Sequence, residues 1–341
     1  MKKGMSISFI LITLCIFMFS AAGPVRADQT LKPVTLTWTA GSVGGQWYSQ
    51  AGGIARLISE KEPKIVIKTV PGGGVVNAAR ISMGKNDVGW GITFVDKMAL
   101  NGVEPLFKAP HTGLRSLGGI FGKYQIHILA DKKLGMETVA DLADMVKNNK
   151  ALRIAVPQRG VSDLNVTEYV LEFYGISLEA IKKAGGKVFH SSYSDMVSLY
   201  KDRHVDLACT MQSYPSATMT EMTLSRNSTL LSMSNECIDT LNKKVGTLSR
   251  DSGFHTIAKG AYKGIDKDVP TVVTASELLI NKDVPENVAY TIIKILCESA
   301  EELHRNLPAT RTFVPEKSWM TVAVPLHPGA EKYYKEAGYI K

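Results

Sequence analysis

Three strand-like segments alternate with two helix-like segments near the start of the chain, and this alternation limits the folds that it can adopt. Residues 34–38 alternate between apolar and polar side chains, as in a strand, and apolar residues then recur at helical spacing over 47–61. A second strand is expected at 64–70, a second helix at 75–84 and a third strand at 87–92. Strands that alternate with helices in this way build a parallel sheet, so we expect an α/β fold.

The same alternation restarts after residue 130 and indicates a second α/β unit. The helices expected there are 138–148, 162–174, 194–202, 215–225 and 235–244, and the strands are 152–156, 187–189, 205–209 and 229–233. Two further helices are expected at 285–305 and 329–337. A chain of this length usually divides into two domains, because a single hydrophobic core stops growing at roughly 250–300 residues.

Two long strand-like segments, 114–130 and 270–280, flank the second unit. They have the length expected of two connections between lobes. We therefore expect one lobe to consist of 34–125 and 275–341, and the other of 126–274. A cleft would lie between the lobes, where strands end and helices begin.

The start of the chain has the pattern of a secretory signal peptide. Lys2 and Lys3 precede an apolar run over 9–19, and a small-residue pattern ends at Ala27, just before Asp28. The apolar run is shorter than the ~20 residues that a membrane span needs. We expect cleavage near Ala27 and Asp28, which would leave an exported, periplasmic protein without a span of its own.

Charge and cysteine content argue against several classes of function. Cleavage would remove three basic residues and no acids, so the formal charge would fall from +8 to +5, with no run of like charges to suggest a nucleic-acid partner. Cys209, Cys237 and Cys297 are an odd number without a CxxC pair, so at most one disulfide could form. The seven histidines form no HxH or HxxxH pair. We expect neither a metal site nor a cofactor.

The first glycine turn, between the segments 34–38 and 47–61, has the composition of a ligand site. A strand that enters a helix through glycines directs backbone N–H groups and the positive end of the helix dipole at one point, which suits an anion. A tight turn alone would explain the glycines, but it would not explain the adjacent aromatic pair, which suits a cleft wall. The residues expected to bind here are Ser42, Val43, Gly44, Gly45, Gln46, Trp47 and Tyr48, with Trp90 shaping the same apolar wall.

A second glycine turn follows the strand 64–70. Gly72 and Gly74 match the dinucleotide pattern GxGxxG, but Asn77 stands at its third glycine position, and no GxxxxGK[ST] motif is present. We therefore expect no nucleotide. The residues expected at the site are Gly73, Gly74 and Val75, which would offer backbone N–H groups, and Asn77, which would either cap the helix or bond the ligand.

A third turn, PQRGVSD at 157–163, belongs to the second lobe. The Arg159 guanidinium could bind a carboxylate through two hydrogen bonds, and Gly160 and Val161 would add backbone N–H groups. Ser162 or Asp163 is equally a good helix N-cap, so a structural role stays open. A fourth polar turn begins after the strand 205–209. The remaining residues expected at the site are Ser162, Gln212 and Tyr214.

Catalytic groups are harder to find than ligand donors. Ala40-Gly41-Ser42-Val43-Gly44 resembles the GxSxG turn of serine hydrolases, with alanine at its first position. No histidine or acid is spaced to suggest a partner for Ser42. We therefore do not expect an enzyme, and an exported hydrolase that uses Ser42 is kept as an alternative.

Several stretches occur together, in order, as they do in one known family. LTWTAGSVGGQWYSQAGGIARLI, VPGGGVVNAARI and DVGWGITFVD, followed by AYKGIDKDVPTVVTASELLINKDVPENVAYTIIKIL and VPLHPGAEKYYKEAGYIK, resemble the TAXI family, the extracytoplasmic solute receptors of TRAP transporters. The resemblance covers essentially the whole chain after the signal peptide.

This resemblance implies a type II periplasmic-binding-protein fold, in which two α/β lobes with a hinge close on a solute in a central cleft. It implies a small carboxylate or amino acid as ligand, of the glutamate, glutamine or 2-oxoglutarate class, and a TRAP membrane permease as partner. Carried over by position, the ligand turns are 41–48, 73–77 and 158–162, with Gln212 and Tyr214. Gln46 and Trp47 depart from the commoner family pattern, as does the turn QRGVSDLN. A binding protein that serves a signalling receptor would share all of these features.

Overall fold

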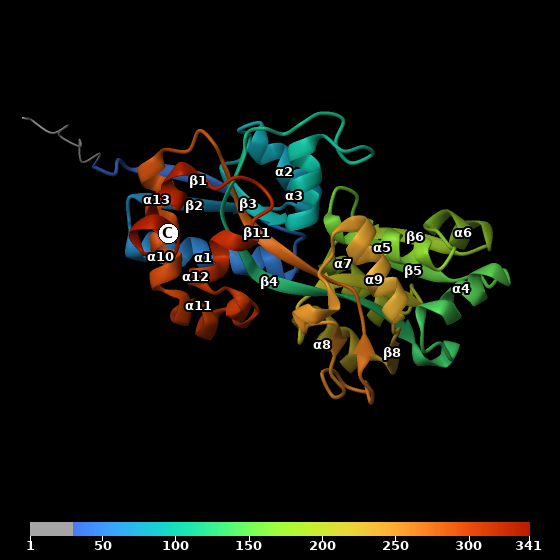
Figure 1. Ribbon diagram of the computed structural model, residues 1–341. Helices are drawn as coiled ribbons and strands as arrows, with labels where there is room; N and C mark the ends of the chain where they lie inside the picture. Colours follow the sequence, from blue (N-terminus) through green and yellow to red (C-terminus); the bar gives the residue numbers. More distant parts are fainter. Residues whose placement is uncertain (1–29) are drawn as a thin grey trace, which may run out of the picture. The chain divides into compact units, whose positions relative to one another are not determined.

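The computed structural model describes residues 30–341 (Figure 1). The expected signal peptide, with its cleavage site near Ala27 and Asp28, lies outside the described residues. Among the helices of 30–341, none is long and apolar enough to cross a membrane. Leu31–Lys341 form one compact unit, and the description below concerns this unit.

A single sheet of nine strands runs through the unit, in the order β2-β1-β3-β11-β4-β7-β5-β6, with β8 also paired to β4. Its strands are β1 (Val34–Thr39), β2 (Ile65–Val70), β3 (Val88–Ile92), β4 (Leu114–Asp131), β5 (Arg153–Pro157), β6 (Lys187–Ser191), β7 (Leu207–Gln212), β8 (Ser228–Leu230) and β11 (Val273–Asn281). The short strands β9 (Thr256–Ile257) and β10 (Val269–Pro270) pair separately. Strand β1 is parallel to β2 and β3, and β5 is parallel to β6 and β7, as the alternating pattern predicts.

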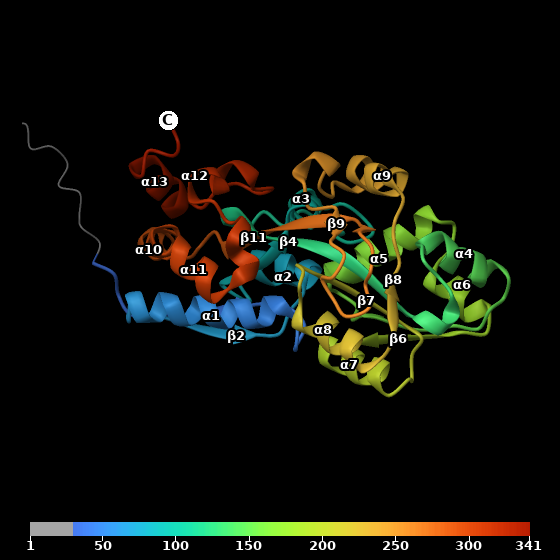
Figure 2. The ribbon, with the colours of Figure 1, turned by 90° about the horizontal axis from the view of Figure 1, so that it is seen from below.

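Helices cover both faces of the sheet, as Figure 2 shows for α9 on one side and α7 and α8 on the other. The helices are α1 (Gln46–Lys61), α2 (Gly74–Ser82), α3 (Thr93–Asn101), α4 (Val139–Lys147), α5 (Ser162–Phe173), α6 (Leu178–Lys183), α7 (Tyr193–Lys201), α8 (Ala217–Ser225), α9 (Asn235–Val245), α10 (Glu286–Glu298), α11 (Ala300–Asn306), α12 (Pro315–Ser318) and α13 (Pro328–Glu336). The single helix expected at 285–305 is therefore wrong, because the helix breaks at Ser299. Helix α6 and the short helix α12 were not expected.

The two long strands β4 and β11 are antiparallel to each other and run through the middle of the unit (Figure 1). Strand β4 pairs with β11 from Leu114 to Gln125 and with β7 from Gln125 to Ala130, so it changes its main partner at Gln125. The lobe bounds expected from the sequence, 34–125 with 275–341 and 126–274, stay a prediction. Irregularities gather in the same stretch: Ile120 has a φ of 52°, which is unusual for a β-branched residue, and the pairing register shifts on both sides of Glu277 and Leu278.

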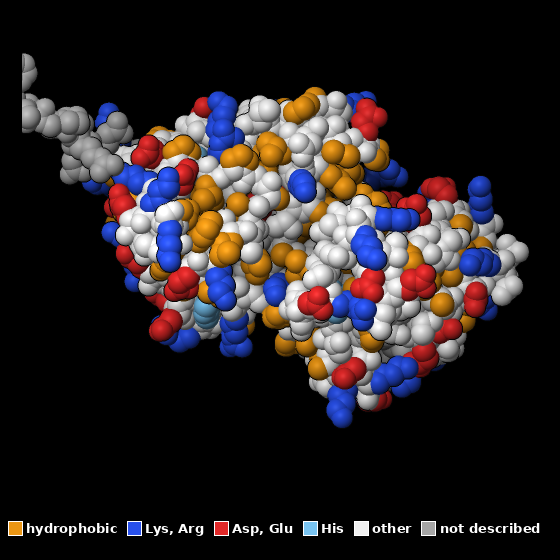
Figure 3. All heavy atoms as spheres, viewed as in Figure 1, with side chains coloured by type: hydrophobic (Ala, Val, Ile, Leu, Met, Phe, Trp, Pro, Cys, Tyr) orange, Lys and Arg blue, Asp and Glu red, His pale blue; other side chains and the backbone are white. Residues whose placement is uncertain are grey.

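Buried side chains support both ends of the sheet. Around β1 and β3, the Trp38 and Trp90 rings meet edge to face with centroids 5.2 Å apart, and Phe121 stacks on Phe313 at 4.2 Å. Other apolar side chains pack beneath β5, β7 and α5. The ends of these strands are thus held on rigid bases, and the glycine turns follow directly from them. On the face drawn in Figure 3, Lys and Arg side chains are interspersed with Asp and Glu.

Candidate functional site

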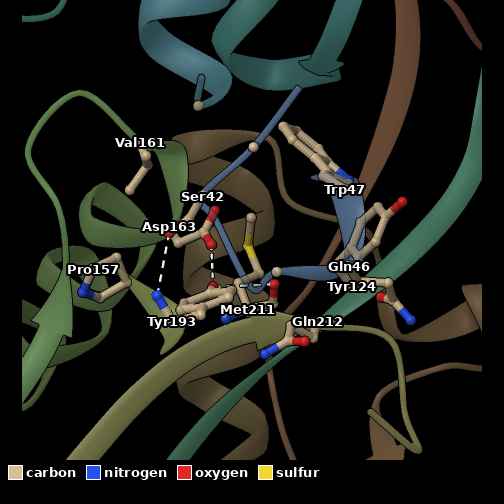
Figure 4. Close-up of a pocket in the computed structure, with 13 residues that line it drawn as sticks. Ser42, Gln46, Trp47, Tyr124, Pro157, Val161, Asp163, Tyr193, Met211 and Gln212 are labelled. Atoms are coloured by element: carbon tan, nitrogen blue, oxygen red, sulfur yellow. Dashed lines mark hydrogen bonds between the residues drawn. The ribbon is translucent and has the colours of Figure 1, made fainter. Parts of the chain in front are cut away.

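A cavity lies where the turns after β1, β2, β5 and β7 meet (Figure 4). Its lining comes from Gly41, Ser42, Gly45, Gln46, Trp47, Gly73, Tyr124, Pro157, Val161, Asp163, Tyr193, Met211 and Gln212. The space open to the centre of a water molecule is about 30 Å³, which is room for about two waters. The turns therefore lie close together around a small interior.

Direct hydrogen bonds join the turns across this cavity. The Tyr193 N–H donates to Ser42 Oγ at 3.2 Å, and the Val76 N–H donates to the Gly160 carbonyl at 3.1 Å. Gln46 Oε1 accepts hydrogen bonds from the N–H group and the hydroxyl of Ser213, at 3.1 and 2.8 Å. In each bond, one partner belongs to the β1–β3 end of the sheet and the other to the β5–β7 end. The site is therefore in a closed arrangement.

Gly73 allows the start of α2 to touch the start of α5. A Cβ atom added to Gly73 would stand 2.2 Å from Val161 Cγ1, which is closer than side chains can approach. Gly44 has a φ of 79°, and a Cβ atom there would stand 3.0 Å from the Ser194 nitrogen. Glycine is needed at both positions because the chain passes too close to Val161 and to Ser194 for a side chain to fit. A tight turn alone would not impose this requirement.

Helices α1, α2 and α5 all begin at the cavity, and no side chain of the described residues caps them. Their N-cap residues are Gly45, Gly73 and Val161. The expectation that Ser162 or Asp163 caps α5 is wrong, because both already lie inside the helix. The first N–H groups of a helix have no partner within it. Those of α1 and α5 are therefore available to an anionic group in the cavity.

Asp163, in the first turn of α5, is the acid of the cavity. The Tyr193 hydroxyl donates to Asp163 Oδ2 and accepts from the Met211 N–H at 2.8 Å, while the Ser162 hydroxyl donates to Oδ1 at 3.2 Å. Burial raises the pKa of the Asp163 carboxyl to about 6. Among the described residues that line the cavity, none is lysine, arginine or histidine. The carboxylate therefore has hydrogen-bond donors but no opposite charge beside it.

Gln212, at the end of β7, presents a second unusual polar group. Its side chain is 2% exposed, and its Oε1 accepts from the Thr218 hydroxyl at 3.3 Å. Its Nε2 has no hydrogen-bond partner within residues 30–341. Because an unpaired buried donor is costly, Gln212 Nε2 is well suited to bind an acceptor in the cavity.

Aromatic side chains form another side of the cavity. The Trp47 and Tyr124 rings meet edge to face with centroids 5.7 Å apart. Trp90 is fully buried and donates from Nε1 to the Trp47 carbonyl at 3.1 Å, so it supports the start of α1 from below and does not line the cavity. Tyr48 packs against the buried apolar cluster that contains Trp38 and Trp90.

Asn77 is fully buried, and its amide bonds the protein itself. Its Nδ2 donates to the carbonyls of Ala40 and Trp90 at 2.7 and 2.8 Å, and its Oδ1 accepts from the Gly73 N–H at 2.9 Å. Asn77 thus ties the ends of β1 and β3 to the second glycine turn. Its role is therefore structural and close to helix capping, which was one of the two roles expected for Asn77.

The structure brings part of the expected site together around the cavity and leaves the rest beside it. The expected residues that line the cavity are Ser42, Gly45, Gln46, Trp47, Gly73, Val161 and Gln212. Those outside its lining are Val43, Gly44, Tyr48, Gly74, Val75, Asn77, Trp90, Arg159, Gly160, Ser162 and Tyr214. The Arg159 side chain is exposed, so its contact with a ligand stays a prediction.

Sequence reasoning missed Tyr124, Tyr193 and Met211, and it considered Asp163 only as a cap. An acid in the first turn of a helix that follows a glycine turn was the signal that could have identified Asp163. Tyr124 and Tyr193 carried no such local signal, because they reach the cavity from the long strand β4 and from α7.

Acids, histidines and cysteines can also form metal sites or reactive thiols. Within the described part of the chain, no group of three or more His, Cys, Asp or Glu side chains is placed to hold a metal ion. Cys209, Cys237 and Cys297 are all buried and free, and burial raises the pKa of the Cys209 thiol to about 12. The thiols are therefore small core groups and not nucleophiles.

Comparison with known proteins agrees with this architecture. The model of the NMT1-like family matches residues 38–338. The periplasmic binding protein BugD is 17% identical, covers 90% of this chain over 98% of its own, and superposes with a TM-score of 0.53. MatC from Rhodopseudomonas palustris, with bound malate, is 13% identical, covers 91% of this chain over 100% of its own, and gives a TM-score of 0.56. These likenesses confirm the expected fold class, two α/β lobes with a hinge and a central cleft, and the chain belongs to the NMT1-like family.

Proposed function

We propose that this protein is the periplasmic solute receptor of a TAXI-type TRAP transporter. It captures a small organic carboxylate or amino acid between its lobes and delivers the solute to the membrane permease. The observation that carries the proposal is the cavity itself. Turns from both ends of the sheet line it, and the uncapped helices α1 and α5 begin there.

Capture follows from the bonds that join the turns. Opening the hinge breaks the bonds from Tyr193 to Ser42 and from Ser213 to Gln46, and it exposes the helix N-termini. A solute carboxylate that reaches those N–H groups adds contacts from both lobes at once. The solute must also hold the turns farther apart than they lie here, because the cavity described above has room for about two waters. Because the solute binds the closed state better than the open one, it shifts the population toward closure.

Two kinds of support come from outside the cavity. The sequence resembles the TAXI family over essentially the whole chain after the expected signal peptide, and the start of the chain has the pattern of such a peptide. MatC, which has the same fold, was solved with malate bound, a small dicarboxylate. Neither fact identifies the solute of this chain.

A thermal-shift screen over organic acids and amino acids tests the proposal. A ligand present at 100 times its Kd should stabilise the protein by about 2.7 kcal/mol and so raise its Tm by several degrees. Calorimetry should then give one solute per chain, and small-angle scattering should show a more compact protein with solute than without. Capture of the purified receptor by the permease would separate transport from sensing.

The hydrolase alternative predicts a different result. Turnover of an ester or amide that disappears in Ser42→Ala would contradict the receptor. A serine nucleophile needs a histidine as the base that takes its proton. Ser42 Oγ instead accepts a hydrogen bond from the Tyr193 N–H, and no histidine lines the described cavity. We therefore expect stoichiometric binding without product.

A further inference from the structure

The charge of the cavity lining restricts the solute more narrowly than the proposed function does. Asp163 is its acid, and the two tyrosines of the lining stay neutral, because burial raises the pKa of Tyr124 to about 12 and that of Tyr193 well above its usual value. The nearby Cys209 thiol is neutral for the same reason. A solute with only negative groups would therefore meet a carboxylate and no compensating cation.

Coulomb's law sets the strength of that repulsion. Two like charges about 4 Å apart repel each other about fourfold more strongly at the effective dielectric constant of a protein site than in bulk water. Two partly buried acids of this chain, Asp131 and Asp206, instead have arginine partners. Arg226 donates to Asp131, and the Arg153 guanidinium lies 2.6 Å from Asp206 Oδ1, whereas the donors to Asp163 are the neutral hydroxyls of Tyr193 and Ser162.

Donor groups for a carboxylate are present in the same cavity. The unpaired Gln212 Nε2 lies among the lining residues, and the uncapped first turn of α1 begins at Gln46 and Trp47. Figure 4 shows Asp163, Tyr193 and Met211 joined by hydrogen bonds, with Trp47 and Tyr124 on the other side in this view. The cavity thus offers one carboxylate acceptor, several neutral donors and an apolar wall.

Building on the proposed receptor function, we infer that the solute is an α-amino acid with an uncharged side chain, and that Asp163 binds its ammonium group. The donors at Gln212 and at the start of α1 bind its carboxylate. Trp47, Tyr124 and Met211 contact its side chain. Because none of the described lining residues is basic, a second carboxylate on that side chain would have no cation to pair with. Glutamine and the aliphatic amino acids fit this description, whereas glutamate and the 2-oxo acids fit less well.

The test uses sets of compounds that share one side chain: the amino acid, the 2-oxo acid and the decarboxylated amine. Calorimetry and thermal shift on the mature protein should show binding of the amino acid, and both analogues should bind about 100-fold more weakly or worse, as expected for the loss of a buried charge contact. Glutamine and the aliphatic amino acids should bind more tightly than glutamate. Tighter binding of the 2-oxo acid would overturn the inference and leave the receptor function intact.

The pH dependence of binding distinguishes the two charge types by its sign. An ammonium group needs ionised Asp163, so affinity for the amino acid should fall as the pH drops below about 6. A purely anionic solute would bind better as Asp163 takes up a proton, so its affinity should rise over the same range. A rise for the best amino-acid ligand would contradict the assignment of Asp163.

Substitution of Asp163 adds a second readout. Asp163→Asn keeps an oxygen that can accept from Tyr193, so the fold should persist while amino-acid binding weakens by about 100-fold and loses its pH dependence. Asp144→Asn is the matched control, because this exposed acid of α4 loses the same charge far from the cavity lining. Unchanged or tighter binding by Asp163→Asn would overturn the inference. If no compound of any set binds the wild-type protein, the receptor function itself is wrong.

Discussion

Glu277→Gln should make the protein more stable above pH 7 and leave its stability at pH 5 almost unchanged. Glu277 lies on β11 and faces Asp96 of α3, and both side chains are fully buried. Burial raises the pKa of Glu277 to about 7. Burial, followed by the charge of Glu277, holds the pKa of Asp96 well above its ordinary value. The folded protein therefore retains a proton that the unfolded chain loses near pH 4.5.

The sign and size of this change in stability follow from proton linkage. Between pH 4.5 and 7 the folded state binds more protons than the unfolded state, so the free energy of unfolding falls as the pH rises through this window. Each pKa unit is worth about 1.4 kcal/mol, so a shift from 4.5 to about 7 costs on the order of 3 kcal/mol at pH 8. Glutamine carries no charge, and its side-chain oxygen can still accept from the Ala323 N–H, as Glu277 Oε2 does at 3.1 Å.

The assay is urea unfolding of both proteins at pH 5, 6, 7 and 8. The difference between them reports Glu277 together with the change that it causes at Asp96, because His127, whose pKa burial lowers to about 4, contributes equally to both. Glu104→Gln, an exposed change of the same kind, should shift stability by less than about 0.5 kcal/mol at every pH. A variant that is less stable than wild type at pH 8, or that gains as much at pH 5 as at pH 8, would refute the reasoning.

Two further substitutions test the closure of the site and the second lobe. Gly73→Ala should weaken amino-acid binding at least about tenfold in calorimetry, because its Cβ would meet Val161 Cγ1 at 2.2 Å. The control is Gly52→Ala, whose Cβ would meet no atom within 4 Å and which should bind normally. Equal affinities of the two variants would contradict the close approach at Gly73. Arg226→Ala should lower the free energy of unfolding by about 2–3 kcal/mol, because Asp131 loses a charged hydrogen-bond partner that is itself buried. A loss below about 1 kcal/mol in urea unfolding would show that water replaces that partner.

Local pattern predicted the strands, the helices and the turns that connect them. The glycine turns between β1 and α1 and between β2 and α2 lie where hydrophobic periodicity changes from two residues to about 3.6, and this change is visible in the sequence alone. Helix caps were less certain. Helix α5 begins at Ser162, as the expected helix 162–174 does, but Val161 is its N-cap, so Asp163 lies in the first turn and lines the cavity. Arg159 precedes the helix and is exposed.

The rest of the site depends on contacts between distant residues, which no local pattern encodes. Tyr193 reaches Asp163 and Ser42 only after β6 has paired with β5 and brought α7 to the cavity. Tyr124 lines the cavity because β4 pairs with β11, almost 150 residues farther along the chain. The sequence indicated which turns would come together at the cavity, whereas the charge of its lining became evident only from the folded arrangement.

The pairing of β4 with β11 determines how the lobes can separate. Because the two connections are hydrogen-bonded neighbours in one ribbon, they must bend together, and the register shifts beside Glu277 and the left-handed Ile120 mark where the ribbon is least regular. Opening can therefore proceed without breaking the ladder. In deuterium exchange, amides along β4 and β11 should stay protected in the solute-free protein, while those at Ser213 and Tyr193, which join the turns, should exchange early.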